Sequence, residues 1–63
     1  MRSYLIYNMY KAQFKATSPY GAWQTIGSYG TEAQAMASAI RKKTAGAIMV
    51  RVTDKKGSVV YTG

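Results

Sequence analysis

The side chains of this chain that could do chemistry are almost all lysines and arginines. Nine of them stand against two acids, and the 63 residues include no histidine and no cysteine, so the formal net charge is +7. The nine are Arg2, Lys11, Lys15, Arg41, Lys42, Lys43, Arg51, Lys55 and Lys56. So large an excess on a small body attracts polyanions and repels basic partners. The composition therefore predicts an anionic binding partner.

Catalysis fits the same composition poorly. Without histidine or cysteine there is no usual general base near neutral pH, no thiolate nucleophile and no soft metal site. Catalysis by paired carboxylates needs two acids close together, whereas Glu32 and Asp54 are explained by a helix start and a turn. We therefore expect a protein that is not an enzyme and that uses no metal or cofactor.

The cations fall into groups by their position in the chain. Lys11, Lys15 and Arg51 lie in strand-like segments, residues 41–43 close a helix, and residues 55–56 lie at a hairpin tip. The helix-end group either complements the negative end of the helix dipole or contacts phosphates. Taken together, the groups favour phosphate contacts because almost no acids balance them.

Aromatic side chains are interleaved with the strand cations. Tyr7 shares a strand face with Lys11 and Lys15, and Tyr20 lies in a turn. Aromatic and basic residues together on a sheet can stack bases and hold phosphates. In the alternative interpretation, the tyrosines only cover the sheet and pair across strands.

Trp23 also has two interpretations. In the first, it caps the hydrophobic core at the start of a strand and is structural. In the second, it lies beside Tyr20 in a loop and is an exposed anchor for a base or for a protein partner. The sequence leaves both open.

The elements that position these residues follow from periodicity and turn chemistry. Segment 2–15 lacks glycine and proline and predicts one long strand, whose even residues, including Ala12 and Phe14, face the core. Residues 18–21, Ser-Pro-Tyr-Gly, have the composition of a type I turn. This turn leads into a second strand over about 22–28.

A helix follows the second strand. Thr31 is its expected cap, and Glu32 lies where the helix dipole favours negative charge. The helix runs to residue 43, and Gly46 ends it. Its expected core face has apolar residues three and four positions apart. These are Ala33, Met36, Ala37 and Ile40.

Two further strands, over 47–53 and 58–62, are joined by a turn in which Gly57 takes a left-handed conformation. The order is ββαββ in a single small basic domain, residues 1–63. We expect an α+β fold, with an antiparallel sheet of three to four strands and one helix on one face. Because one helix covers one face only, function is expected on the other face.

Part of this pattern resembles a known group of proteins. The resemblance is carried by Ala-Trp at 22–23, Ser-Tyr-Gly-Thr-Glu-Ala at 28–33 and Ala-Ile-Met-Val-Arg-Val at 47–52, and with the helix it spans about two thirds of the chain. The pattern is similar to small ββαββ domains of bacteria and phages, including the architecture of the early inhibitor of host RNA polymerase from T-odd coliphages. It implies a fold and a phage-like origin. Since that inhibitor depends on acidic side chains, no functional residue is carried over to this basic chain.

The first functional expectation is non-enzymatic, weakly sequence-specific binding of nucleic acid, DNA or RNA, through the basic surface. The expected contacts are Lys11, Lys15, Arg41, Lys42, Lys43, Arg51, Lys55 and Lys56 to phosphates, with Tyr7 and Tyr20 as stacking groups. The alternative is a small phage-type protein that binds an acidic patch of a host protein and modulates it, with Trp23 as anchor. A homodimer through the open sheet face is a third alternative.

The chain is expected to be cytoplasmic and to bind no membrane. Asn8 and Lys11 interrupt the apolar N-terminal stretch, and no small-residue cleavage site follows, so it does not fit a secretion signal. No segment approaches the ~18 apolar residues that a membrane span needs. The absence of cysteine fits a reducing compartment.

Overall fold

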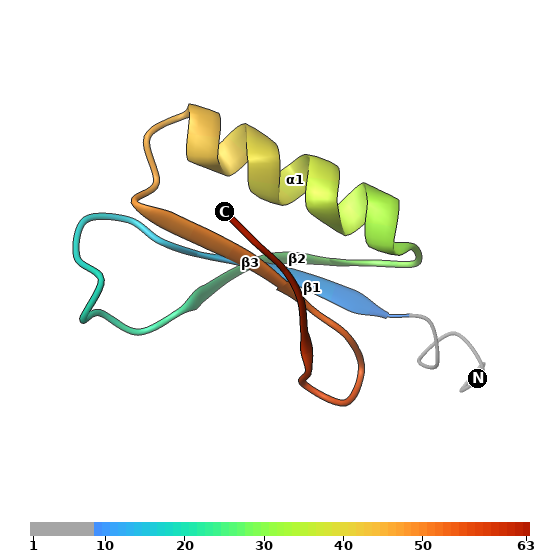
Figure 1. Ribbon diagram of the computed structural model, residues 1–63. Helices are drawn as coiled ribbons and strands as arrows, with labels where there is room; N and C mark the ends of the chain where they lie inside the picture. The colour runs from blue at the N-terminus through green and yellow to red at the C-terminus, as the bar shows by residue number, and fades with distance from the viewer. Residues whose placement is uncertain (1–8) are drawn as a thin grey trace.

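The computed structural model describes residues 9–63 and has the expected order of elements (Figure 1). These are β1 (Tyr10–Lys15), β2 (Gln24–Tyr29), α1 (Glu32–Thr44), β3 (Met49–Thr53) and β4 (Val59–Thr62). The strands form one antiparallel sheet in the spatial order β2-β1-β3-β4. The prediction of an α+β fold in ββαββ order is confirmed. Residues 2–8 of the expected first strand, with Tyr7, lie outside the described residues.

Local hydrogen bonds form both predicted turns. The turn at 18–21 closes with an amide-to-carbonyl bond of 3.2 Å between its last and first residues. In the turn between β3 and β4, Asp54 Oδ1 accepts bonds of 2.9 Å from the amides of Lys56 and Ser58. Gly57 has a φ of +88°, which residues with a side chain rarely adopt. Asp54 therefore serves the turn, as expected.

Helix α1 begins and ends where its flanking residues predict. Thr31 Oγ1 accepts a hydrogen bond of 3.1 Å from the amide of Gln34, which has no partner within the helix. At the other end, Gly46 takes a φ of +120°. Two amide-to-carbonyl bonds of 3.1 Å run from residues 46–47 back to residues 42–43. This is the Schellman arrangement, which satisfies the last carbonyls of the helix.

The core lies between α1 and one face of the sheet (Figure 1). Its fully buried members are small: Ala12, Val50 and Val52 from the sheet, and Ala35 and Ala39 from the helix. Larger, partly buried side chains surround this centre, and they are Tyr10, Phe14, Ile26, Tyr29, Met36, Ala47 and Tyr61. The even residues of β1 therefore face the core, as their alternation predicts.

The predicted core face of α1 is wrong. Of its four residues, only Met36 packs against the core. Ala33 and Ala37 are exposed, and the side chain of Ile40 is 46% exposed. The helix is thus rotated about its axis relative to the expectation, and an apolar stripe faces outward.

The buried face of α1 consists of small residues only, whereas the predicted face also includes Met36 and Ile40. Ala35, Ser38 and Ala39 are buried. The sheet supplies the bulky aromatic side chains of this core, so a helix face of small residues allows the two layers to approach closely. Ser38 Oγ is hydrogen-bonded to Tyr29 Oη at 2.7 Å, which makes the burial of a serine favourable.

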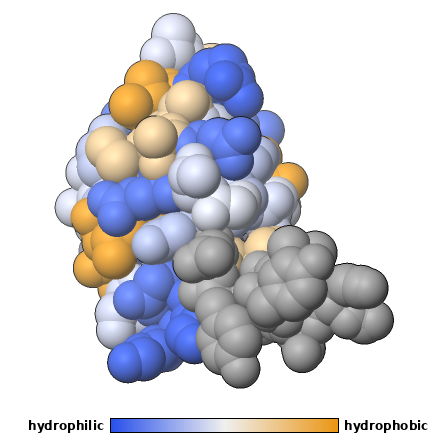
Figure 2. Space-filling model, turned by 90° about the vertical axis from the view of Figure 1, so that its right-hand side faces the viewer, coloured by the Kyte–Doolittle hydropathy of each residue, from blue (hydrophilic) through white to orange (hydrophobic). Residues whose placement is uncertain are grey.

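Exposed apolar side chains are distributed over several elements. Ile40 belongs to α1, Ile48 to its connection with β3, and Val59 and Val60 to β4. On the side of the molecule where α1 begins, Figure 2 shows hydrophilic residues interspersed with hydrophobic patches. Within residues 9–63, no helix has the length and hydropathy of a membrane span.

Candidate nucleic-acid interface

The sheet face opposite α1 carries the cations of the strands. Ala12 of β1 is buried in the core, so residues 11, 13 and 15 lie on the opposite face. The register pairs Gln13 with Arg51 and Lys15 with Met49 of β3. The open face therefore holds cations from two neighbouring strands.

A chain of hydrogen bonds crosses this face. Arg51 Nε donates to Gln13 Oε1 at 2.8 Å, and Gln13 Nε2 donates to Thr25 Oγ1 at 3.2 Å. The chain links β3, β1 and β2, so it fixes the direction of the Arg51 side chain. Only one of the five guanidinium N–H groups takes part in it, and the others can bind a further acceptor.

Trp23 lies beside these cations. The Cζ atom of Arg51 is 4.3 Å and the Nζ atom of Lys15 is 4.8 Å from the centroid of its ring. The indole is half-buried. Each cation over the ring contributes about 0.5–1 kcal/mol at an exposed site. We call Lys15, Trp23 and Arg51 the Trp23 cluster.

The interpretation of Trp23 as a cap of the core is wrong. In the register of β1 with β2, Gln24 pairs with Phe14, whose side chain packs against the core. Trp23 directly precedes β2, and its ring contacts Lys15 and Arg51, which lie on the opposite face of the sheet. Trp23 is not among the described residues that pack against the core.

Both acids of the chain are placed away from the Trp23 cluster. Glu32 is the first residue of α1, and the carboxylate of Asp54 accepts backbone hydrogen bonds in the turn between β3 and β4. The positive charges of Lys15 and Arg51 thus lie over one ring, and neither Glu32 nor Asp54 offsets their repulsion. An external anion would lower that repulsion, so the cluster is suited to bind one.

Tyr20 is presented next to the Trp23 cluster. It lies in the turn at 18–21, and its side chain is 95% exposed. The ammonium of Lys15 donates to the carbonyl of Pro19 at 2.7 Å, which ties this turn to the cluster. An exposed ring beside fixed cations is the arrangement that stacks on a base while phosphates are held nearby.

The helix-end cations lie in the other layer of the molecule. Lys42 Nζ is 4.3 Å from the ring centroid of Phe14, on the core side of the sheet. Lys43 Nζ donates to the carbonyl of Ile48 at 2.9 Å, and Arg41 is exposed. These three cations thus belong to the helix layer, whereas the Trp23 cluster is on the opposite face of the sheet. Lys43 lies at the same end of the sheet as Lys15, because the amide of Ile48 donates to the carbonyl of Lys15 at 2.9 Å.

The remaining predicted contacts, Lys55 and Lys56, are exposed at the turn between β3 and β4. Gln13 and Thr25, which hold Arg51 in place, are not identified by charge or by motif. The one sequence signal for Gln13 is its odd position in β1, between two lysines. Thr25 has no such signal, because its partner depends on the strand register.

No family model, curated protein or solved structure matches this chain. The resemblance to small phage and bacterial domains therefore stays a prediction from the sequence.

Proposed function

We propose that the protein is a non-enzymatic nucleic-acid-binding domain whose interface is the open face of the sheet. The observation that carries the proposal is the Trp23 cluster, in which Arg51 and Lys15 lie over one ring while both acids of the chain are placed elsewhere. Aromatic and basic side chains gathered on a sheet are the features with which proteins hold single strands.

The residues of the open face have separate roles in this proposal. Lys11, Lys15 and Arg51 contact phosphates, and Tyr20 stacks on a base. The guanidinium of Arg51 is already oriented by Gln13, so little of its side-chain entropy is lost on binding. Contacts to phosphates carry no base information, so the binding is only weakly sequence-specific.

Fluorescence anisotropy with labelled oligothymidine and oligouridine of roughly 12 nucleotides tests the proposal at low salt. We expect both to bind, and Arg51→Gln to weaken binding roughly tenfold, because a charge-assisted contact to phosphate is lost. Comparison of the two oligonucleotides also shows whether DNA or RNA is preferred.

Arg41→Gln is the matched control. It removes the same charge from an exposed position in the helix layer, so it changes the net charge equally but leaves the open face intact. We expect it to weaken binding about twofold through the long-range field alone. Equal losses in the two variants, or no binding of either oligonucleotide at low salt, would contradict the proposal.

Tyr20 favours a second candidate function. A tyrosine that is 95% exposed at a turn is also a typical anchor for a protein partner. In this alternative, the domain binds an acidic patch of a host protein and modulates its activity. The basic surface steers the domain to that patch. Affinity capture with nuclease treatment separates the two functions. The alternative requires that a stoichiometric protein partner is still captured after nuclease treatment, and that the Tyr20→Ser variant no longer captures it.

A further inference from the structure

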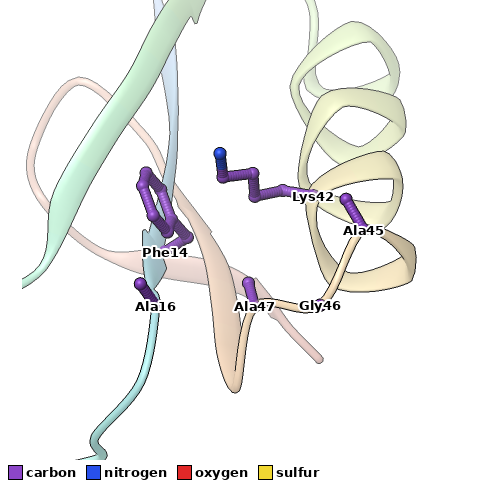
Figure 3. A pocket seen from close by; sticks show the side chains of 6 residues that line it. All are labelled: Phe14, Ala16, Lys42, Ala45, Gly46 and Ala47. Carbon is purple, nitrogen blue, oxygen red and sulfur yellow. The ribbon is translucent and has the colours of Figure 1, made fainter.

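A pocket of about 220 Å³ lies on the helix side of the sheet (Figure 3), and the Trp23 cluster lies on the opposite face. It is formed by the end of β1, the last turn of α1 and the connection from α1 to β3. Its lining residues are Phe14, Ala16, Lys42, Ala45, Gly46 and Ala47. The walls are thus one aromatic ring and small residues, with a single charged side chain.

The local backbone explains why this space is open. Gly46 has a φ of +120°, and a Cβ atom built on it would meet no atom within 4 Å. The amides of residues 46–47 already donate to the last carbonyls of α1. They are therefore not available as donors to a ligand, and polar recognition in the pocket falls to Lys42.

Lys42 extends from the helix across the pocket towards Phe14 (Figure 3). Its Nζ atom is 4.3 Å from the centroid of the ring, and the residue is half-buried. Glu32 is at the opposite end of the same helix, and Asp54 is held in the turn between β3 and β4. Neither of these carboxylates therefore supplies a counter-charge for the ammonium, and an anion bound in the pocket could do so.

The sign of the local field agrees with an anion. The C-terminal end of a helix carries the equivalent of roughly −0.5 elementary charge. The last turn of α1 has three basic residues, at 41–43. Their positive charges exceed the dipole, so a negative group at the mouth of the pocket is attracted.

We propose that this pocket binds a small carboxylate with an apolar body. The carboxylate contacts the ammonium of Lys42, and the body packs against the Phe14 ring and the methyl groups of Ala16 and Ala47. The volume is below the range of roughly 300–1,000 Å³ that is usual for whole drug-sized ligands. The pocket therefore accepts a fragment, which is either a free organic acid or the C-terminal residue of a peptide. This site is independent of the proposed nucleic-acid interface.

A titration followed by ¹H–¹⁵N NMR tests the proposal, with 3-phenylpropanoate and its uncharged amide as probes. We expect the acid to shift the amide signals of Ala16, Gly46 and Ala47. The uncharged amide has the same shape but lacks the charge, so we expect it to bind roughly tenfold more weakly. Lys42→Gln should remove this difference between the two probes.

Lys43→Gln is the matched control, because it removes the same charge from the neighbouring position, whose ammonium contacts the Ile48 carbonyl. It should leave the preference for the acid in place. Equal binding of the two probes to the unchanged protein, shifts confined to the open sheet face, or an unchanged preference in Lys42→Gln would overturn the proposal.

A second arm separates the two sources of the ligand. The probes are acetyl-Gly-Gly-Phe with a free C-terminus and the same peptide as its C-terminal amide. Tighter binding of the free C-terminus than of 3-phenylpropanoate supports the pocket and assigns it to a chain end. Binding of 3-phenylpropanoate alone supports the pocket and assigns it to a free acid. Failure of all carboxylate probes overturns it.

Discussion

Gln13 keeps the guanidinium of Arg51 in place without neutralising it. Its side-chain oxygen accepts the Arg51 Nε bond at 2.8 Å, and its amide group donates to Thr25. Gln13→Glu keeps the shape but gives Arg51 an internal carboxylate, which competes with phosphate for the same N–H groups. We expect oligonucleotide affinity to fall roughly tenfold. Anisotropy measures the affinity, and urea denaturation is expected to show no loss of stability.

The comparison for this variant is Gln24→Glu. Gln24 is exposed on the neighbouring strand and pairs with Phe14, so the new charge lies on the other face of the sheet. Both variants lower the net charge equally, and the second should weaken binding only about twofold. If Gln13→Glu binds as well as Gln24→Glu, the Arg51 guanidinium is not a phosphate contact.

At the scale of elements, the rotation of α1 decides which of its alanines tolerate a larger side chain. Ala39 has no exposed surface, whereas Ala37 is exposed. Ala39→Leu should destabilise the fold by about 1–3 kcal/mol because it overpacks the contact with the sheet. Ala37→Leu should change stability by less than about 0.5 kcal/mol. Urea denaturation measures both, and the opposite ranking would restore the helix face predicted from the sequence.

The helix shows what sequence can and cannot determine in this fold. Its ends were predictable because Thr31 and Gly46 act through bonds to their own neighbours. Its core face was not, because alanines lie on both candidate stripes: Ala33 and Ala37 on the predicted one, and Ala35 and Ala39 on the buried one. The choice between them depends on the size of the side chains that the sheet presents, and that is a tertiary property.

The same distinction holds for the candidate site. Alternation within β1 was enough to place Lys11 and Lys15 on one face. Trp23 required the register of β1 with β2, which shifts at a bulge between Ala12 and Gln13. A single-residue slip moves a side chain to the other face, so local sequence alone left both positions of Trp23 open.

At the scale of the whole molecule, six of the nine basic side chains form two groups that lie in different layers. The open face has three cations on β1 and β3, and the helix layer has those of residues 41–43. Each phosphate contact to a single strand contributes about −0.7 to the slope of log affinity against log salt concentration, so three contacts give about −2. We expect this slope from anisotropy titrations with oligothymidine.

A variant with glutamine at residues 41–43 tells whether the two layers act together. If binding is confined to the open face, these changes lower the affinity through the long-range field but leave the slope of log affinity against log salt concentration at about −2. If the slope is about −4 for the unchanged protein and becomes flatter in the variant, the nucleic acid contacts both layers. The interface would then have to wrap around an edge of the sheet, and the Trp23 cluster would be one part of a larger electrostatic surface.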